Sequence, residues 1–182
     1  IMLIKCKTKA GTIHSIDEDK EIHRGGEGRI ILMSNNLVAK IYHPNITPIT
    51  EEKFIYLHKL DKASFVAPEE LLYDGKGKVI GFTMQYLGQD FFPISTISGK
   101  TFCISNNINS KIKVKIAKAL IKAVEAAHNQ GVVIGDLNPL NILINVKGDI
   151  KMIDTDSYEV PGVLHTGILL DDIRDYLYHG KV

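Results

Sequence analysis

Three oxygen-bearing side chains lie close together in the second half of the sequence: Asp136, Asn141 and Asp154. They stand on predicted loops at the ends of a short apolar hairpin, residues 142–144 and 150–153. Carboxylate and amide oxygens are hard ligands, which suit Mg²⁺ when it shares its other positions with water and substrate phosphates. The alternative is that each residue only stabilises its own turn. The position of all three beside one hairpin favours a metal site and leaves that alternative open.

A glycine-rich turn in the first half could bring the backbone close to a phosphate. Residues 23–30 read His-Arg-Gly-Gly-Glu-Gly-Arg-Ile and place Gly25, Gly26 and Gly28 between two extended segments. A backbone without side chains can approach a phosphate through its amide groups. An ordinary hairpin turn is the alternative, and a Walker motif is excluded because no Gly-Lys-Ser/Thr follows.

Lys40 is the one charged residue in the apolar run 37–42. Strand alternation would place it on the same face as Val38. A solvated lysine at a sheet edge and a lysine that neutralises a phosphate both fit this pattern. The run alone does not separate the two.

The first part of the chain, residues 1–87, is expected to be β-rich with one helix. Its apolar segments alternate with turn signals, among them the hairpin turn Asp-Gly-Lys-Gly at 74–77. Thr50 can cap a helix whose first turn carries Glu51 and Glu52, where carboxylates suit the helix dipole.

The second part, residues 88–182, is expected to be mainly helical. Residues 110–130 carry apolar side chains at three-and-four spacing, which is typical of a long helix, and Gly131 is its natural end. The apolar hairpin follows. The predicted fold class is therefore α+β, with a boundary near Leu87.

In this order the features resemble the eukaryotic-type protein kinase superfamily over residues 17–158. Within it, the phrases at 133–138 and 153–158 are most similar to divergent bacterial or phage-borne serine/threonine kinases of the YegI-like kind. The motifs that carry the resemblance are the glycine loop at 23–30, Val38-Ala39-Lys40, Glu52, the gatekeeper and hinge at 84–88, Gly135-Asp136 through Asn141, and Asp154. The resemblance implies a bilobal kinase-like fold with an antiparallel sheet in the first lobe.

The resemblance also implies ATP and Mg²⁺, or Mn²⁺ in its place, as cofactors. Lys40 would neutralise the α- and β-phosphates, and Glu52 would hold that lysine by a charge-assisted bond. Asp136 would orient the acceptor hydroxyl and accept its proton, while Asn141 and Asp154 would hold the metal.

The remaining nucleotide contacts are implied in the same way. Backbone amides of the glycine loop would cover the phosphates, and an apolar slot closed by a gatekeeper would hold the adenine. The residues concerned are Gly25, Gly26 and Gly28 for the loop, Ile30, Ala39 and Leu143 for the slot, Met84 for its depth, and Gln85 and Leu87 for the hinge.

Three substitutions depart from the kinase pattern. Gly135 replaces an arginine that grips a phosphorylated activation loop, so control by such phosphorylation is not expected. Asn138 replaces a lysine that helps to neutralise the transferring phosphate, which predicts a slower enzyme or a different acceptor. Thr155 and Asp156 replace Phe-Gly, and Asp156 is either a second metal ligand or a loop cap.

The length after Asp154 is short for a kinase. Only 28 residues follow, with one short helix expected at 169–179 and no Ala-Pro-Glu element. The second lobe is therefore expected to be reduced or truncated. Either the kinase is exceptionally small or the chain is a fragment of a longer one.

Composition limits the compartment and the partners. The 22 Lys and Arg nearly balance the 21 Asp and Glu, so neither nucleic acid nor a membrane is an expected partner. With two distant cysteines and no apolar run of about 18 residues, the expected location is the cytoplasm, or a host cytoplasm if the protein is a delivered effector. The leading hypothesis is a kinase for Ser or Thr hydroxyls of a protein substrate. A pseudokinase that binds nucleotide and a small-molecule kinase are the alternatives.

Overall fold

The computed structural model describes residues 2–162 and divides the chain into two compact units. The first unit comprises Ile1–His58 with Ala67–Gly88, and the second comprises Lys59–Val66 with Gln89–Val182. The division at 87 and 88 that the sequence suggested stays a prediction. The helix predicted at 169–179 lies outside the described residues.

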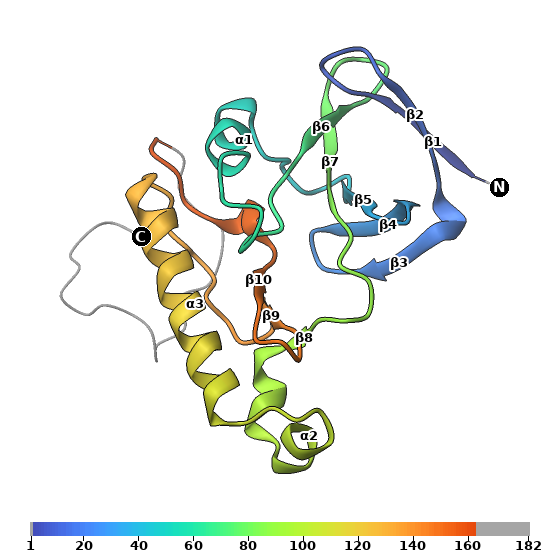
Figure 1. Cartoon of the computed structure of the whole chain (residues 1–182). Coiled ribbons are helices and arrows are strands. Elements are labelled where there is room, and N and C mark those ends of the chain that lie inside the picture. Colours follow the sequence, from blue (N-terminus) through green and yellow to red (C-terminus); the bar gives the residue numbers. More distant parts are fainter. Residues whose placement is uncertain (1, 163–182) are drawn as a thin grey trace. The chain divides into compact units, whose positions relative to one another are not determined.

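The first unit is a seven-stranded antiparallel sheet with the strand order β2-β1-β6-β7-β5-β4-β3 (Figure 1). Its strands are β1 (Leu3–Lys7), β2 (Ile13–Asp17), β3 (Glu21–Arg24), β4 (Gly28–Ser34), β5 (Leu37–Tyr42), β6 (Glu70–Tyr73) and β7 (Val79–Gln85), with a 3₁₀ turn at Glu18–Lys20.

Strand β5 lies in the interior of this sheet, between β4 and β7, and both of its faces are covered. Alternation sends Ala39 and Ile41 into one apolar cluster and Tyr42 into the other, where it makes an edge-on ring contact with Phe82. Lys40 lies on the Tyr42 face and is only 7% exposed. The alternative of a solvated edge lysine is therefore wrong.

The predicted helix after Thr50 is confirmed as α1 (Glu51–Leu57). The Thr50 hydroxyl accepts a hydrogen bond from the Lys53 backbone amide at 3.1 Å, which is the expected N-cap. The buried side chains of this helix are Lys53 and Leu57, whereas Glu52 is exposed.

The second unit contains one long helix and a small antiparallel sheet of order β10-β9-β8. Its elements are β8 (Phe92–Pro93), a 3₁₀ turn (Ile94–Ser98), α2 (Lys100–Ser105), α3 (Ser110–Asn129), β9 (Ile142–Ile144), β10 (Ile150–Met152) and a 3₁₀ turn η3 (Thr155–Ser157). The long helix and the hairpin of the sequence prediction are confirmed as α3, β9 and β10. Gly131, at φ +75°, follows the end of α3 in the left-handed conformation that favours glycine.

The segment 59–66 packs with the second unit through backbone and ring contacts. Val66 N donates to Met152 O, and Met152 N donates to Ser64 O, each at 2.8 Å. The Phe65 ring meets the Tyr158 ring edge-on at 6.3 Å between centroids. Strand β10 is thereby held on the side away from β9.

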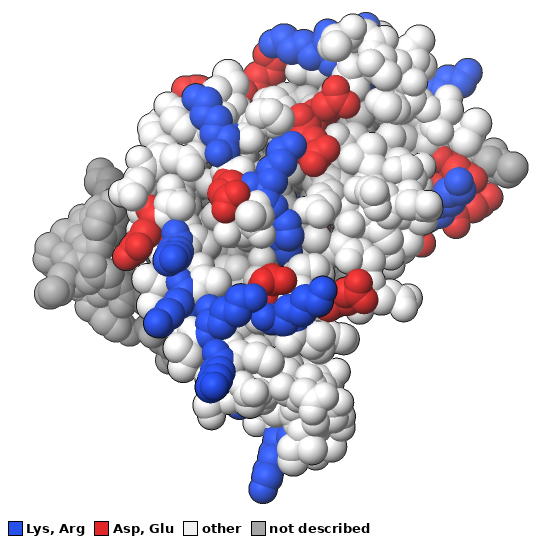
Figure 2. Space-filling view, viewed as in Figure 1, with Lys and Arg blue, Asp and Glu red and all other residues white. Residues whose placement is uncertain are grey.

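The outer face of α3 is basic, and Figure 2 shows lysine and arginine side chains gathered over this part of the second unit. Four exposed lysines lie on one side of the helix at three-and-four spacing: Lys111, Lys115, Lys118 and Lys122. The near-neutral charge of the chain thus includes a local basic stripe. Among residues 2–162, no helix has the length and apolarity needed to cross a membrane.

Candidate functional site

The loop that carries Asp136 is anchored on both sides. Val132 is fully buried after α3, and Val133 exchanges two backbone hydrogen bonds with Glu159, at 2.8 and 2.9 Å. This isolated antiparallel bridge connects the start of the loop to the segment that follows η3. Asp136 therefore begins a loop whose entry is fixed by the core.

Asp136 and Asn141, two of the predicted site residues, are brought together. The Asn141 side-chain amide donates to Asp136 Oδ2 at 2.9 Å and to the Asp136 carbonyl at 3.4 Å. Because its NH₂ group is turned to Asp136, the Asn141 Oδ1 atom is the one turned elsewhere and suited to a cation. The substituted residue Asn138 also reaches Asp136 Oδ2, at 3.3 Å.

Asp154 is connected to the same loop through the backbone. Ile153 N donates to the Asn141 carbonyl at 2.9 Å, directly before Asp154. Asp154 has φ 58° and ψ 38°, a left-handed conformation that Asp tolerates better than most residues. Its carbonyl accepts hydrogen bonds from the Ser157 hydroxyl and amide, at 2.8 and 3.2 Å. The 3₁₀ turn therefore stabilises this uncommon backbone conformation.

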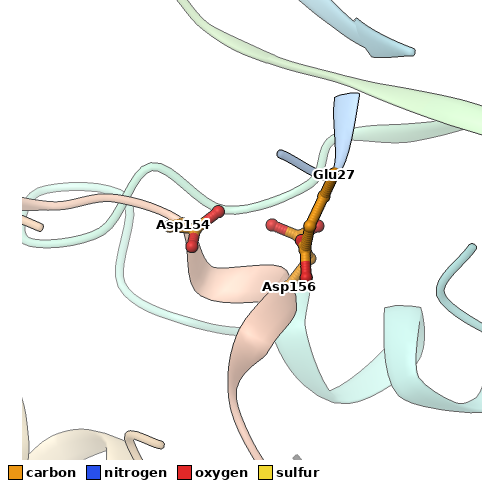
Figure 3. A group of neighbouring side chains, drawn as sticks. All are labelled: Glu27, Asp154 and Asp156. Carbon is orange, nitrogen blue, oxygen red and sulfur yellow. The ribbon is translucent and has the colours of Figure 1, made fainter. Parts of the chain in front are cut away.

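Asp156 lies in the same turn as Asp154, and Figure 3 shows both side chains. Glu27, which is labelled in the same view, belongs to the first unit. Asp154 and Asp156 each offer a carboxylate oxygen within 4.8 Å of the other's. Asp156 is 6% exposed, and its neighbour Thr155 donates its hydroxyl to the Val66 carbonyl at 3.2 Å. Hard carboxylate oxygens at this separation fit a divalent cation of the Mg²⁺ type.

The negative charge of this region acts on a buried tyrosine. Burial raises the pKa of Tyr158 well above its usual value, and the charges of Asp154, Asp136 and Asp156 raise that pKa further. These carboxylates therefore all lie near enough to one phenol to oppose its ionisation. Negative charge therefore gathers around this turn, where a divalent cation would neutralise it.

Of the predicted phosphate-covering glycines, only Gly28 is required by packing. A Cβ at Gly28 would lie 2.5 Å from the Ile41 carbonyl oxygen, whereas a Cβ at Gly26 would meet nothing within 4 Å. Gly25 N donates to Gly28 O at 2.9 Å and closes the turn between β3 and β4. The close approach of β4 to β5 explains Gly28 without a ligand, and the role of all three glycines at a phosphate stays a prediction.

Lys40 pairs with a carboxylate that the sequence did not single out. Its Nζ lies 3.4 Å from Glu27 Oε2, and 5.5 Å from the centre of the Tyr42 ring. Glu27 lies inside the glycine-rich turn, between Gly26 and Gly28, and this position is the sequence feature that could have indicated it as a partner of Lys40. The pairing of Lys40 with the exposed Glu52 stays a prediction.

The predicted adenine slot needs one correction. Ala39 lies on the sheet face opposite Lys40, in the cluster that contains Ile31 and Ile41, so it does not share the face of the lysine. Val38 does, because it is two residues from Lys40 on the same strand. The predicted residues that pair on that face are Ile30, opposite Lys40, and Met84, opposite Val38.

The other predicted nucleotide contacts lie at the ends of their strands. Gln85 is the last residue of β7 and lies opposite Leu37. The next residue, Tyr86, donates its backbone N–H to the Asn36 carbonyl at 2.9 Å, and Leu87 comes directly after it. Leu143 lies in β9 of the second unit. Their contacts with adenine stay predictions.

Known proteins give a consistent picture of the fold. No protein-family model matches the chain. Protein kinase YegI from Escherichia coli strain K12 is 26% identical over 177 residues, which cover 89% of this chain and 26% of YegI. CBL-interacting protein kinase 12 from rice, Oryza sativa subsp. japonica, is 25% identical over 161 residues, covering 85% of this chain and 24% of that protein. The chain spans about a quarter of the length of these curated relatives.

Solved structures extend the likeness to the fold. The ROP18 kinase domain, in complex with AMP-PNP and sucrose, has a TM-score of 0.53 at 15% identity, over 87% of this chain and 56% of that one. ROP2 from Toxoplasma gondii, a virulence factor with a protein-kinase fold and no enzymatic activity, has a TM-score of 0.52 at 12% identity, over 88% and 55%. The predicted α+β kinase-like fold is confirmed, and the chain is a divergent protein-kinase-like protein.

Proposed function

We propose that the protein transfers the γ-phosphate of ATP to Ser or Thr hydroxyls of a protein substrate. The observation that carries this proposal is the joint placement of Asp136, Asn141 and Asp154 in the second unit. The Asn141 side-chain amide donates to Asp136 Oδ2 at 2.9 Å. Ile153, the residue before Asp154, donates its backbone N–H to the Asn141 carbonyl, also at 2.9 Å. A base and two oxygen donors for a cation on one hairpin are the parts that phosphoryl transfer needs.

The metal would be held by Asn141 and Asp154, with Asp156 as a further candidate ligand. A bound Mg²⁺ supplies electrostatic stabilisation of the charge that develops on the phosphate oxygens. The oxygen donors of this turn and the negative potential around Tyr158 support a hard divalent cation. No soft ligand is needed, so Mn²⁺ can substitute.

Asp136 would act on the acceptor. The transfer breaks the bond between the γ-phosphorus and the bridging oxygen of ATP and forms a bond to the acceptor hydroxyl oxygen. The hydroxyl proton passes to the Asp136 carboxylate, which the loop holds by two amides. In the first unit, Lys40 is buried and paired with Glu27, and it is the residue proposed to neutralise the phosphates.

Phosphate transfer from γ-labelled ATP to generic protein substrates tests this function. We expect Mg²⁺-dependent incorporation that is retained in Asp149→Asn and lost in Asp154→Asn. Asp149 is a matched control because it lies in the turn of the same hairpin and pairs with surface Lys115 at 2.8 Å. Mass spectrometry of the acceptor would identify phosphoserine or phosphothreonine. No incorporation with any protein acceptor, or equal incorporation in both variants, would contradict the proposal.

A nucleotide-binding pseudokinase is the second candidate. It is favoured by Asn138, which stands where kinases place a phosphate-neutralising lysine, and one protein with a similar fold, ROP2, has no enzymatic activity. In this case ATP with Mg²⁺ would raise the melting temperature of the wild type while no phosphate is transferred. The two candidates therefore differ in turnover and not in binding.

A further inference from the structure

The carboxylate of Asp136 receives hydrogen bonds on one oxygen only. Asn141 Nδ2 donates to Oδ2 at 2.9 Å, and Asn138 Nδ2 donates to the same atom at 3.3 Å. Among residues 2–162, no side chain or amide donates a hydrogen bond to Oδ1. The two carboxylate oxygens therefore differ: one is engaged twice and the other is left to accept a proton.

The orientation of the Asn138 amide is fixed by its own loop. Its Oδ1 accepts a hydrogen bond from Leu140 N at 2.7 Å, and its carbonyl accepts one from Asn141 N at 3.0 Å. Since a backbone N–H can only donate, the oxygen of the amide must face Leu140. The NH₂ group must then face Asp136. A lysine at this position could not accept the Leu140 hydrogen bond.

We propose that Asn138 is a positioning residue that holds Asp136 with Oδ1 presented to the acceptor hydroxyl. Asn138 stands where kinases place a lysine, and its side-chain amide is the second one, after that of Asn141, that donates to Asp136. This inference rests on the proposed phosphotransfer function. It assigns Asn138 a role that acts through Asp136 and not through the nucleotide.

Two substitutions separate this role from simple capping of the loop. Asn138→Asp keeps an oxygen for Leu140 N but replaces the donor to Asp136 with a second carboxylate. Asn138→Ser can also cap the turn through its hydroxyl and adds no charge, but it has no NH₂ group for Asp136. If capping were the only role, both variants would keep wild-type turnover.

Asn145 offers a matched control in the same unit. Its Oδ1 accepts from Lys147 N and Asp149 N at 3.0 Å each, and its Nδ2 donates to Asp149 Oδ2 at 3.0 Å. It thus repeats the chemistry of Asn138 on an aspartate to which no catalytic role is assigned. Asn145→Asp reports the general cost of this exchange.

Steady-state kinetics with γ-labelled ATP on the full chain gives the test. We expect kcat to fall roughly 10- to 100-fold in Asn138→Asp and Asn138→Ser, because a small misplacement of a catalytic group has this effect. KM for ATP and the ATP-induced shift in melting temperature should stay within about 2-fold of wild type, as should all constants of Asn145→Asp. Unchanged kcat in a folded Asn138→Ser would overturn the inference alone. A wild type without turnover would overturn the proposed function as well.

Discussion

Gly28 provides a stability test that separates packing from ligand binding in the glycine-rich turn. In Gly28→Ala the new Cβ would lie 2.5 Å from the Ile41 carbonyl oxygen and 3.2 Å from Tyr42 Cα. Ordinary contacts begin at 3.4 Å, so β4 and β5 must separate locally by 3.4 − 2.5 = 0.9 Å. Both obstacles are backbone and cannot turn away. We expect a cost of about 2–3 kcal/mol, at the upper end for overpacking.

Gly26→Ala is the control, because a Cβ there meets nothing within 4 Å in the same turn. Its unfolding free energy should stay within about 0.5 kcal/mol of wild type. Urea unfolding followed by circular dichroism, without nucleotide, measures both. With a slope of about 1–3 kcal/mol/M, this cost should lower the Gly28→Ala midpoint by about 0.7–3 M. Equal midpoints for the two variants would refute the packing explanation of Gly28.

Three further outcomes follow from the first unit. Thr50→Ala should lower the unfolding free energy by about 1 kcal/mol by removing the N-cap of α1, and Thr50→Ser should restore it in urea unfolding; no loss in the alanine variant would contradict the cap. Lys40→Met should weaken ATP binding at least about 10-fold by calorimetry, because it removes the ammonium proposed to neutralise the phosphates, and unchanged affinity would contradict that role. Burial, and then the hydrogen bond to Glu51, raise the pKa of Tyr73 to about 12. The folded protein therefore holds this proton longer than the unfolded chain, whose tyrosines ionise near pH 10, so stability should fall as pH rises from about 10 to 12. That fall should be smaller in Tyr73→Phe, and an equal fall would refute the assignment.

The elements with a clear period could be predicted from the sequence. The long helix follows from apolar residues at three-and-four spacing, and the helix after Thr50 follows from its cap and acidic first turn. The hairpin that carries Asp136 and Asp154 at its ends follows from two short apolar runs. Local signals were sufficient in these cases, because neighbours in sequence determine the outcome.

The features that depend on strand order could not be predicted. Lys40 is buried because β7, which follows β5 by more than thirty residues, pairs with it on the side away from β4. Strand alternation places Val38 on the face of Lys40 and Ala39 on the opposite face, whereas the resemblance to the kinase motif implied that Ala39 lines the adenine slot. On α1, only the packed structure shows that Lys53 turns inward and that Glu52 is exposed.

Asn138 is the residue for which the role expected from the sequence and the contacts in the structure differ most. From the sequence it was a missing cation, whereas its side chain in the structure links Leu140 N to Asp136 Oδ2. That arrangement depends on the turn geometry between 136 and 141. No periodicity or composition signal encodes such a turn.

The most direct test of the central claim is the rate of γ-phosphate transfer in Asp136→Asn compared with wild type and Asp149→Asn. The exchange keeps the shape of the side chain and removes the proton acceptor. The account predicts that turnover falls at least about 100-fold in Asp136→Asn, with nucleotide binding retained and Asp149→Asn unchanged. Transfer by Asp136→Asn at the wild-type rate would contradict it.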